Sequence, residues 1–170
     1  MIKIAPSILS ANFAAMGDAV LHLKEQGADW IHFDVMDGNF VPNITFGPDM
    51  CKALRPLTDL PIDVHLMVEH PSDWIEPFKA AGADILTIHV ESSERHLHRA
   101  LQAIHAAGMK AGVVLNPATP IFCAFICSCS MKYEMLPRKK YSSNATKEPP
   151  NCRNFASIFG LSCSTSNVPP

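Results

Sequence analysis

A short pattern recurs along the chain, in which a glycine ends an amphipathic segment and an apolar strand begins a few residues later. The pattern occurs as GADWIH at 27–32 and as GADILT at 82–87, with a weaker copy, GMKAG, at 108–112. Strands that recur about every 21–33 residues with helices between them form parallel βαβ units, which are right-handed in ~98% of cases. The pattern therefore predicts an α/β fold built on a parallel sheet.

Strands and helices are expected to alternate along the first two thirds of the chain. We expect strands at 3–9, 29–36, 62–67, 84–89 and 111–115, and helices at 15–26, 49–54, 70–81 and 93–107. These strands fit the start of a (β/α)8 (TIM) barrel, whose sites lie at the carboxyl ends of the strands. A doubly wound sheet is the alternative, but it usually carries a glycine-rich phosphate loop after its first strand. The segment SILSAN at 7–12 contains no glycine, so we favour the barrel.

The composition excludes several classes of function. The 170-residue chain has 48% hydrophobic residues, 18% charged residues and a formal net charge of −2. These values are typical of a globular protein and give no indication of a nucleic-acid partner. No stretch approaches the ~18 apolar residues of a membrane span, and the amino terminus lacks the apolar run of a signal peptide. We therefore expect no membrane partner and a cytoplasmic location.

The composition changes near Pro120. Residues 1–120 carry 8 Lys/Arg, 14 Asp/Glu and all eight histidines, whereas residues 121–170 carry 6 Lys/Arg, 2 Asp/Glu and five of the six cysteines. Serine, asparagine, proline and lysine dominate the second part without sustained periodicity. We therefore expect a barrel part at 1–120 and a divergent, poorly ordered tail at 121–170.

Two expected strands carry metal-binding residue types on one face. Side chains alternate along a strand, so each strand gathers polar and methionine side chains on one face: His32, Asp34 and Met36 on the first, His65 and Met67 on the second. An imidazole and a carboxylate two residues apart on one face can grip a single metal ion. The alternative is that the two histidines are core residues satisfied by neighbouring carboxylates.

Two further positions indicate where the cluster lies along the strands and which other side chain could face it. The Asp37-Gly38 pair predicts a sharp turn, which places the cluster at the strand's carboxyl end. His89 ends the strand expected at 84–89, and we expect it to be a polar rim residue. The alternative for His89 is a side chain that faces the same mouth as the cluster.

Four segments resemble the ribulose-phosphate 3-epimerases of the pentose phosphate pathway. They are APSILSA at 5–11, HFDVMDG at 32–38, DVHLM at 63–67 and NPATP at 116–120. The resemblance covers residues 1–120 and implies a TIM barrel with isomerase activity. It implies interconversion of D-ribulose 5-phosphate and D-xylulose 5-phosphate by proton abstraction at C3, a phosphorylated ketopentose substrate, and dimers in the full-length family.

The resemblance also implies roles for the matching residues. His32, Asp34 and His65 would be ligands of a divalent metal ion, and such a set suits Zn²⁺, Fe²⁺, Mn²⁺ or Co²⁺. Asp34 would also be the catalytic general base, while the ion stabilises the enediolate as a Lewis acid. The substrate-binding residues implied by the resemblance are Ser7, Met36, His65 and Met67.

The chain departs from the family pattern after Pro120. The family has a fourth metal ligand, an aspartate on a late strand that is also its second acid, and glycine-rich phosphate loops; residues 121–170 match neither. We therefore expect a truncated barrel of about five βα units with little or no turnover. The tail resembles sequence that is read after a splice or frame change. Two alternatives stay open: a related ketohexose-phosphate 3-epimerase, and a non-catalytic truncated isoform that only pairs with full-length subunits.

Overall fold

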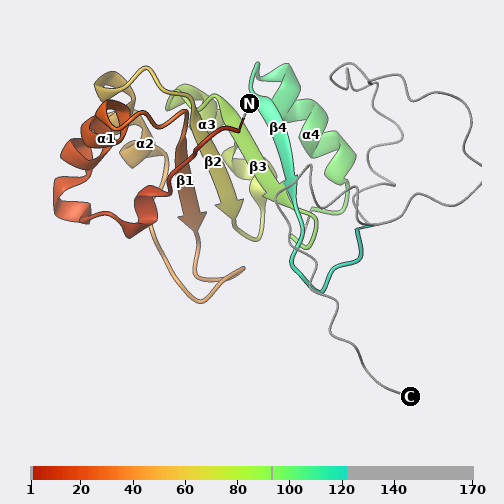
Figure 1. The fold of residues 1–170 in the computed structure, drawn as a ribbon. Coiled ribbons are helices and arrows are strands. Elements are labelled where there is room, and N and C mark those ends of the chain that lie inside the picture. The colour runs from red at the N-terminus through yellow and green to blue at the C-terminus, as the bar shows by residue number, and fades with distance from the viewer. Residues whose placement is uncertain (1, 93, 122–170) are drawn as a thin grey trace, which may run out of the picture. The chain divides into compact units, whose positions relative to one another are not determined.

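The computed structural model describes residues 2–92 and 94–121, so the expectations for the tail lie outside the described residues. Within these described residues, four strands form one sheet (Figure 1): β1 Ile31–Met36, β2 Ile62–Met67, β3 Ile85–His89 and β4 Lys110–Val114. They lie in the order β1-β2-β3-β4, and every neighbouring pair is parallel. This arrangement confirms the predicted α/β fold with a parallel sheet.

Helices connect the strands as expected. Four α-helices precede the four strands in turn: α1 Met16–Glu25, α2 Pro48–Leu54, α3 Ile75–Ala80 and α4 Leu97–Ala106. Short 3-10 helices lie at Ile8–Ser10, Phe13–Ala15, Arg55–Leu57 and Pro71–Trp74. The glycines predicted to end helices have positive φ; Gly82, for example, has φ 89°. A Cβ at this position would lie 2.7 Å from the Arg55 side chain, so both conformation and space require glycine there.

The first expected strand, at 3–9, is wrong as predicted. Only Ser7 forms a bridge, a parallel one to His32, and a 3-10 helix begins at Ile8. The segment still follows β1, because the Pro6 carbonyl accepts a hydrogen bond of 2.9 Å from the backbone N–H of His32. Pro6 has no N–H with which to continue a ladder. Ile4 is 61% exposed whereas Ile8 is 1% exposed, so the segment is buried at Ile8 but not at Ile4.

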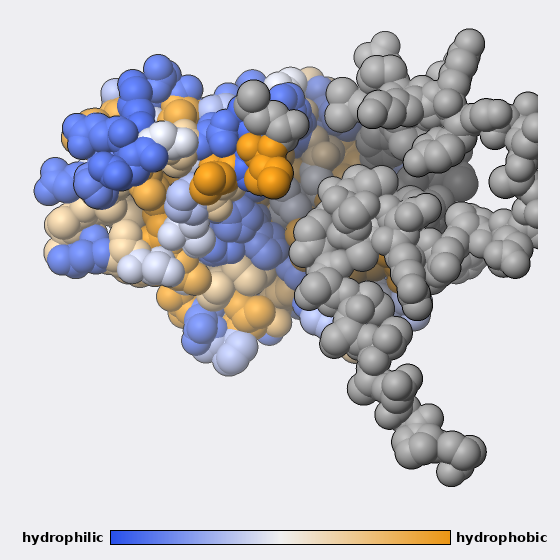
Figure 2. Space-filling view, viewed as in Figure 1, coloured by the Kyte–Doolittle hydropathy of each residue, from blue (hydrophilic) through white to orange (hydrophobic). Residues whose placement is uncertain are grey.

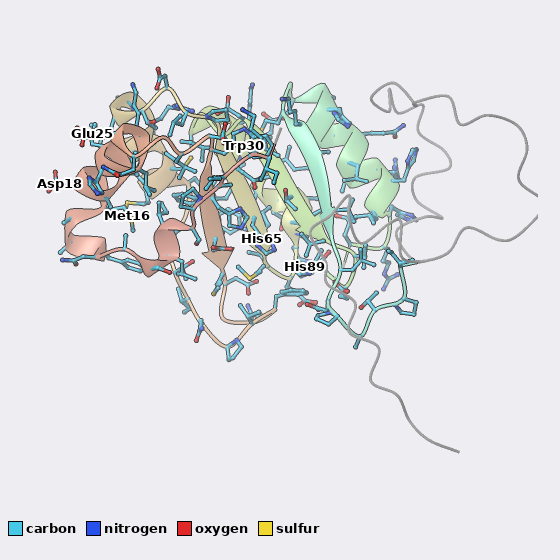
Figure 3. All side chains as sticks on the ribbon, in the orientation of Figure 1. Met16, Asp18, Glu25, Trp30, His65 and His89 are labelled. Atoms are coloured by element: carbon cyan, nitrogen blue, oxygen red, sulfur yellow. The ribbon has the colours of Figure 1, made fainter. Side chains whose placement is uncertain are left out.

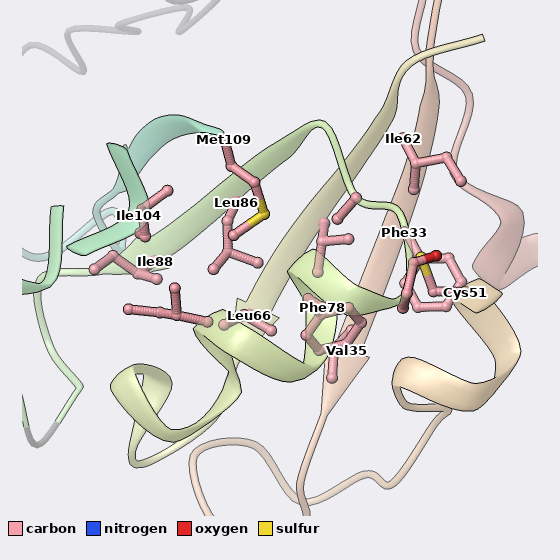
Figure 4. Close-up of a cluster of buried hydrophobic side chains, with 14 of the residues drawn as sticks. Phe33, Val35, Cys51, Ile62, Leu66, Phe78, Leu86, Ile88, Ile104 and Met109 are labelled. Atoms are coloured by element: carbon pink, nitrogen blue, oxygen red, sulfur yellow. The ribbon is translucent and has the colours of Figure 1, made fainter. Parts of the chain in front are cut away.

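The face of the sheet that meets the helices is apolar. Its side chains are at most 5% exposed: Ile31, Phe33, Val35, Ile62, Val64, Leu66, Leu86 and Ile88. Figure 4 shows labelled members of this face, such as Leu66 and Ile88, near helix residues such as Phe78 and Ile104. Because strand side chains alternate between faces, the residues between these apolar positions lie on the opposite face of the sheet.

Apolar side chains also reach the surface of the described residues. Figure 2 shows apolar patches among hydrophilic residues on one face of the molecule. The most exposed large apolar side chains are Ile2 at 90% and Ile44 at 81%. Within 2–92 and 94–121, no helix combines the length and apolar character needed to cross a membrane.

Candidate metal centre

The pairing of β1 with β2 brings the predicted ligands together. Asp34 lies opposite His65 in the parallel register, and His32 lies opposite Asp63. These side chains occupy the face opposite the apolar core. Figure 3 shows the labelled His65 near the end of its strand, with His89 on the neighbouring strand. Asp34 and His65 are each the fourth residue of a six-residue strand, and His89 ends β3. These side chains therefore lie in the carboxyl-terminal half of the strands, toward the end at which barrel sites occur.

Asp34 is the centre of this cluster. Its Oδ1 lies 3.2 Å from His32 Nε2 and 3.0 Å from His65 Nδ1, and the Ser7 hydroxyl donates to Oδ2. The Asp34 residue is only 8% exposed. His32, Asp34 and His65 each offer one ligand atom, and these atoms lie within 4.8 Å of one another. The structure thus gathers the three residues predicted as ligands, and Ser7 beside them.

Asp63 is a member of the cluster that sequence reasoning did not single out. Its Oδ2 lies 2.9 Å from His32 Nδ1, and the Thr87 hydroxyl donates to its Oδ1 at 3.2 Å. The available signal was alternation along the strand, since Asp63 lies two residues before His65 and so shares its face. Asp63 and Asp34 therefore hold the imidazole of His32 between two carboxylates.

The electrostatics of the cluster follow from these contacts. Burial raises the pKa of Asp34, but hydrogen bonds from His32, His65 and Ser7 outweigh it and hold the pKa well below its ordinary value. The hydrogen bond to Asp34, followed by that to Asp63, raises the pKa of His32 to about 9. In the metal-free chain at neutral pH, an ionised Asp34 therefore faces a protonated His32.

His89 is not the rim residue that we expected. The residue is 5% exposed, and its Nε2 lies 2.8 Å from His65 Nε2. The two rings stack with centroids 5.0 Å apart, and His89 Nδ1 lies 3.1 Å from Glu91 Oε2. Burial lowers the pKa of His89. His89 belongs to the cluster because Thr87 is the register partner of His65, and His89, two residues further along β3, shares the face of Thr87.

The loop after β1 is fixed by the predicted Asp37-Gly38 turn. Gly38 has φ 78°, and Asp37 Oδ1 accepts hydrogen bonds from the N–H groups of Asn39 and Phe40 at 2.8 and 2.9 Å. Asp37 Oδ2 accepts another from the Glu69 N–H at 2.8 Å, which joins the ends of β1 and β2. The turn places the Phe40 ring 4.9 Å from the ring of His89.

The two methionines predicted to bind substrate occupy matching positions. Met36 ends β1 and Met67 ends β2, and they are partners in the register. Both are partly buried, on the same face as His65. Their contact with substrate, like that of Ser7, stays a prediction.

The donor set fits a divalent cation. Asp63 is an acceptor, so His32 Nδ1–H donates to it and Nε2 is the nitrogen left toward Asp34. Asp34 is also an acceptor, so this Nε2 and the carboxylate need either a proton or a cation between them. Two imidazole nitrogens and a carboxylate oxygen are ligands that suit zinc and other first-row divalent metals. His32, Asp34 and His65 are therefore able to hold such an ion.

Comparison with known proteins points to one family. The model of the ribulose-phosphate 3 epimerase family matches residues 3–127, which extends past Pro120. The ribulose-phosphate 3-epimerase of Bacillus subtilis (strain 168) is 60% identical over 121 residues, covering 71% of this chain and 55% of the relative. The chloroplastic ribulose-5-phosphate-3-epimerase of Arabidopsis thaliana is 57% identical over 121 residues, covering 71% and 43%. The chain spans about half the length of the curated relatives it matches.

A solved structure shows a similar fold. A Coccidioides immitis protein assigned as a deoxyribose-phosphate aldolase aligns with a TM-score of 0.50 and 15% identity, covering 75% of this chain and 52% of that one. At this identity the likeness concerns the fold alone. Together with the family match, it confirms the predicted α/β class of the TIM-barrel family.

Proposed function

The chain belongs to the ribulose-phosphate 3-epimerase family, a family of isomerases, and on this basis we propose that it abstracts the C3 proton of D-ribulose 5-phosphate. Asp34 is the proposed base. One observation carries the proposal: an ionised carboxylate lies between two histidines, 3.2 and 3.0 Å from their nitrogens, on the polar face of adjacent parallel strands. We place this activity in the cytoplasm and in the pentose phosphate pathway.

We propose His32, Asp34 and His65 as the ligands of a divalent metal ion. When bound, such an ion supplies Lewis-acid stabilisation of negative charge on the substrate oxygens. The protein's own contribution is to hold the ligands in place: Asp63 fixes the ring of His32 at 2.9 Å, and Ser7 fixes the second oxygen of Asp34. Zn²⁺, Fe²⁺, Mn²⁺ and Co²⁺ all suit this donor set.

The residues around Asp34 suit proton transfer at a carbon beside a carbonyl. Asp34 is ionised and can accept the proton, while Ser7 and His65 orient its two oxygens. The same hydrogen bonds lower its basicity, so the donors around Asp34 must weaken as the proton arrives. We propose that Met36 and Met67 line the pocket with polarizable, uncharged side chains that exclude water.

Removal of the proton and inversion at C3 are separable steps. A single group that removes and returns protons on one face exchanges the C3 hydrogen with solvent without inverting the carbon, whereas inversion needs a second acid on the opposite face. The described residues bring one carboxylate, Asp34, between the two histidines. We therefore expect C3 exchange to be faster than formation of D-xylulose 5-phosphate.

The experiment is hydrogen exchange followed by proton NMR. The 170-residue chain is incubated in D₂O with D-ribulose 5-phosphate and Co²⁺, and loss of the C3–H signal is timed. We expect exchange that requires the metal and slows by ~10²–10⁴-fold in Asp34→Asn. The control is Asp59→Asn, at a side chain 76% exposed. Equal exchange rates in wild type and Asp34→Asn would overturn the proposal, and faster exchange of a ketohexose phosphate would favour the related hexose enzyme.

A second candidate is a non-catalytic subunit that pairs with another chain. Among the described strands, β4 pairs only with β3, and beyond β1 there is only the single Ser7 bridge. Open sheet edges of this kind favour pairing with further strands. Light scattering of the chain, alone and mixed with the full-length Bacillus subtilis relative, tests this candidate; a monomer in both samples would exclude it, and a dimer alone would support self-association.

A further inference from the structure

The two nitrogens of His65 face different partners. Its Nδ1 lies 3.0 Å from Asp34 Oδ1, and its Nε2 lies 2.8 Å from His89 Nε2. A contact between two imidazole nitrogens needs one N–H donor and one lone-pair acceptor. The proton positions of His65 therefore depend on both partners: the ionised Asp34 accepts from Nδ1–H, and His89 decides whether Nε2 donates or accepts.

Glu91 decides what His89 presents. An ionised carboxylate only accepts, so the 3.1 Å contact between His89 Nδ1 and Glu91 Oε2 places a proton on Nδ1 of His89. A neutral His89 then has a lone pair on Nε2, which accepts from the Nε2–H of His65. In the metal-free chain the ionised Asp34 accepts a hydrogen bond from His65 Nδ1–H. If a cation took the place of that proton, His65 would keep a proton on Nε2, which is the donor that the acceptor on His89 matches.

This chain of contacts is anchored at its far end. Glu91 Oε1 accepts a hydrogen bond of 2.7 Å from the backbone N–H of Asn116, the first residue of the NPATP segment. The hydroxyl of Ser92 donates to the His89 carbonyl at 2.9 Å, and the ring of Phe40 packs against His89. With His89 5% exposed, water is a poor competitor for these contacts. The backbone of the NPATP segment thus helps to hold Glu91, which contacts His89, and His89 in turn contacts His65.

We infer that His89 and Glu91 are positioning residues that fix His65 in the tautomer whose Nδ1 lone pair can bind a divalent cation. The inference rests on the proposed metal site and goes beyond it, since neither residue is among the proposed ligands. Outer partners of this kind orient metal-binding histidines, and their loss typically lowers metal affinity by ~10–100-fold. On the side away from Asp34, the ring of His32 contacts the carboxylate of Asp63 directly. The ring of His65 instead contacts the imidazole of His89, which in turn contacts the carboxylate of Glu91.

The test is a Co²⁺ titration of the 170-residue chain, followed by visible absorption. In Glu91→Gln the side-chain amide can donate to His89 Nδ1, which moves the His89 proton to Nε2 and blocks the acceptor that His65 needs. We expect Co²⁺ affinity to fall ~10–100-fold. The matched control is Glu25→Gln, at the exposed end of α1 (Figure 3), with a side chain 74% exposed. Affinities of Glu91→Gln and wild type within twofold would overturn the inference.

Two variants of His89 separate positioning from general disruption. His89→Gln offers a side-chain oxygen that can accept from His65, whereas His89→Leu has no acceptor. We expect His89→Gln to bind Co²⁺ more tightly than His89→Leu. Equal losses in both variants, with circular dichroism spectra like that of wild type, would contradict the assigned role.

Imidazole nitrogen-15 NMR of the Zn²⁺-loaded chain reads the proton positions directly. We expect a proton on Nε2 of His65 and none on Nε2 of His89, with the pattern lost in Glu91→Gln. An unprotonated Nε2 on His65 would overturn the inference whatever the metal data show. A wild-type chain that binds neither Zn²⁺ nor Co²⁺ would instead refute the proposed metal site.

Discussion

The two faces of the parallel sheet are built from alternate residues of the same strands, yet they are held by different forces. On the helix-covered face, Phe33, Val64 and Leu66 are fully buried among apolar neighbours, and burial of apolar area stabilises without regard to direction. On the opposite face, Asp34 and His89 are almost as buried but take part in hydrogen bonds, which need a matching donor and acceptor. We therefore expect the apolar face to be sensitive to changes in side-chain volume. The polar face should be sensitive to the exchange of a hydrogen-bond acceptor for a donor, even where the side-chain volume stays the same.

Loss of volume on the apolar face is the largest expected effect on stability. Phe33 is 0% exposed and its ring contacts those of Phe46 and Phe78, with centroids 4.6 and 6.2 Å away. We expect Phe33→Ala to lower the free energy of unfolding by ~3–5 kcal/mol, measured by urea denaturation. If that variant does not fold, Ile62→Val should give a measurable loss of ~0.5–1.5 kcal/mol.

A surface variant controls this prediction. Ile2 is 90% exposed, and Ile2→Ala should change the free energy of unfolding by less than ~0.5 kcal/mol. Similar losses for Phe33→Ala and Ile2→Ala would show that the helix-covered face is not the core of the folded chain.

On the polar face, replacing an acceptor oxygen of Asp34 by a donor, at constant side-chain volume, should remove metal binding. Asp34→Asn keeps the size of the side chain but places an amide next to His32 and His65. We expect Co²⁺ affinity to fall by more than the ~10–100-fold typical of an outer partner, measured by titration calorimetry. The structural cost should be smaller than that of Phe33→Ala. Unchanged affinity would remove Asp34 from the ligand set.

Gly112 offers an intermediate test, because it lies where β4 meets the polar face. A Cβ at Gly112 would lie 2.4 Å from Thr87 Oγ1, so Gly112→Ala must displace Thr87 and weaken its hydrogen bond to Asp63. We expect a loss of ~1–3 kcal/mol in stability and an affinity for Co²⁺ reduced less than in Asp34→Asn. Gly47→Ala is the control, since nothing lies within 4 Å of the added atom. Equal effects of the two substitutions would contradict the role of Thr87.

The charges of the polar face should also give the metal-free chain a pH-dependent stability. The pKa of His32 rises from 6.5 to about 9 on folding, so its stabilisation is complete below pH 6.5 and is lost as pH rises toward 9. Asp34 acts oppositely, since its lowered pKa gives stabilisation that is lost in acid. Burial lowers the pKa of His89. As pH falls below 6.5, the imidazole therefore binds a proton more readily in the unfolded chain than in the folded one, and the free energy of unfolding decreases.

Comparison with a variant isolates the contribution of His32. We expect the free energy of unfolding of the chelator-treated wild type to fall between pH 6.5 and 9, and His32→Gln to flatten that fall. Urea denaturation at four pH values gives the measurement. Parallel pH profiles for wild type and His32→Gln would show that the carboxylates of Asp34 and Asp63 do not stabilise the charged imidazole.

Sequence reasoning found the part of the site that depends on local periodicity. Alternation along single strands was enough to place His32 with Asp34 and to identify His65 on the next strand. The turn at Gly38 followed from the Asp-Gly pair alone. Helices ending in glycine and strands beginning soon after it also follow from local rules, which is why the four strands β1 to β4 were expected near their observed positions.

The rest depends on how strands pair, which a single sequence does not encode locally. The contact of Asp63 with His32 requires the register of β1 against β2, and that of His89 with His65 requires the position of β3 against β2. The failed strand at 3–9 has a similar cause: its apolar residues suggested burial, but the loss of a donor at Pro6 leaves one bridge, at Ser7.

Metal analysis tests most directly the claim that the polar face forms one divalent-cation site. The 170-residue chain is dialysed against Zn²⁺ and then against metal-free buffer, and bound zinc is measured per chain. The account predicts about one equivalent in wild type, as expected for a single mononuclear site, and none in a variant carrying His32→Ala, Asp34→Asn and His65→Ala together. Retention of one equivalent by that triple variant would contradict it.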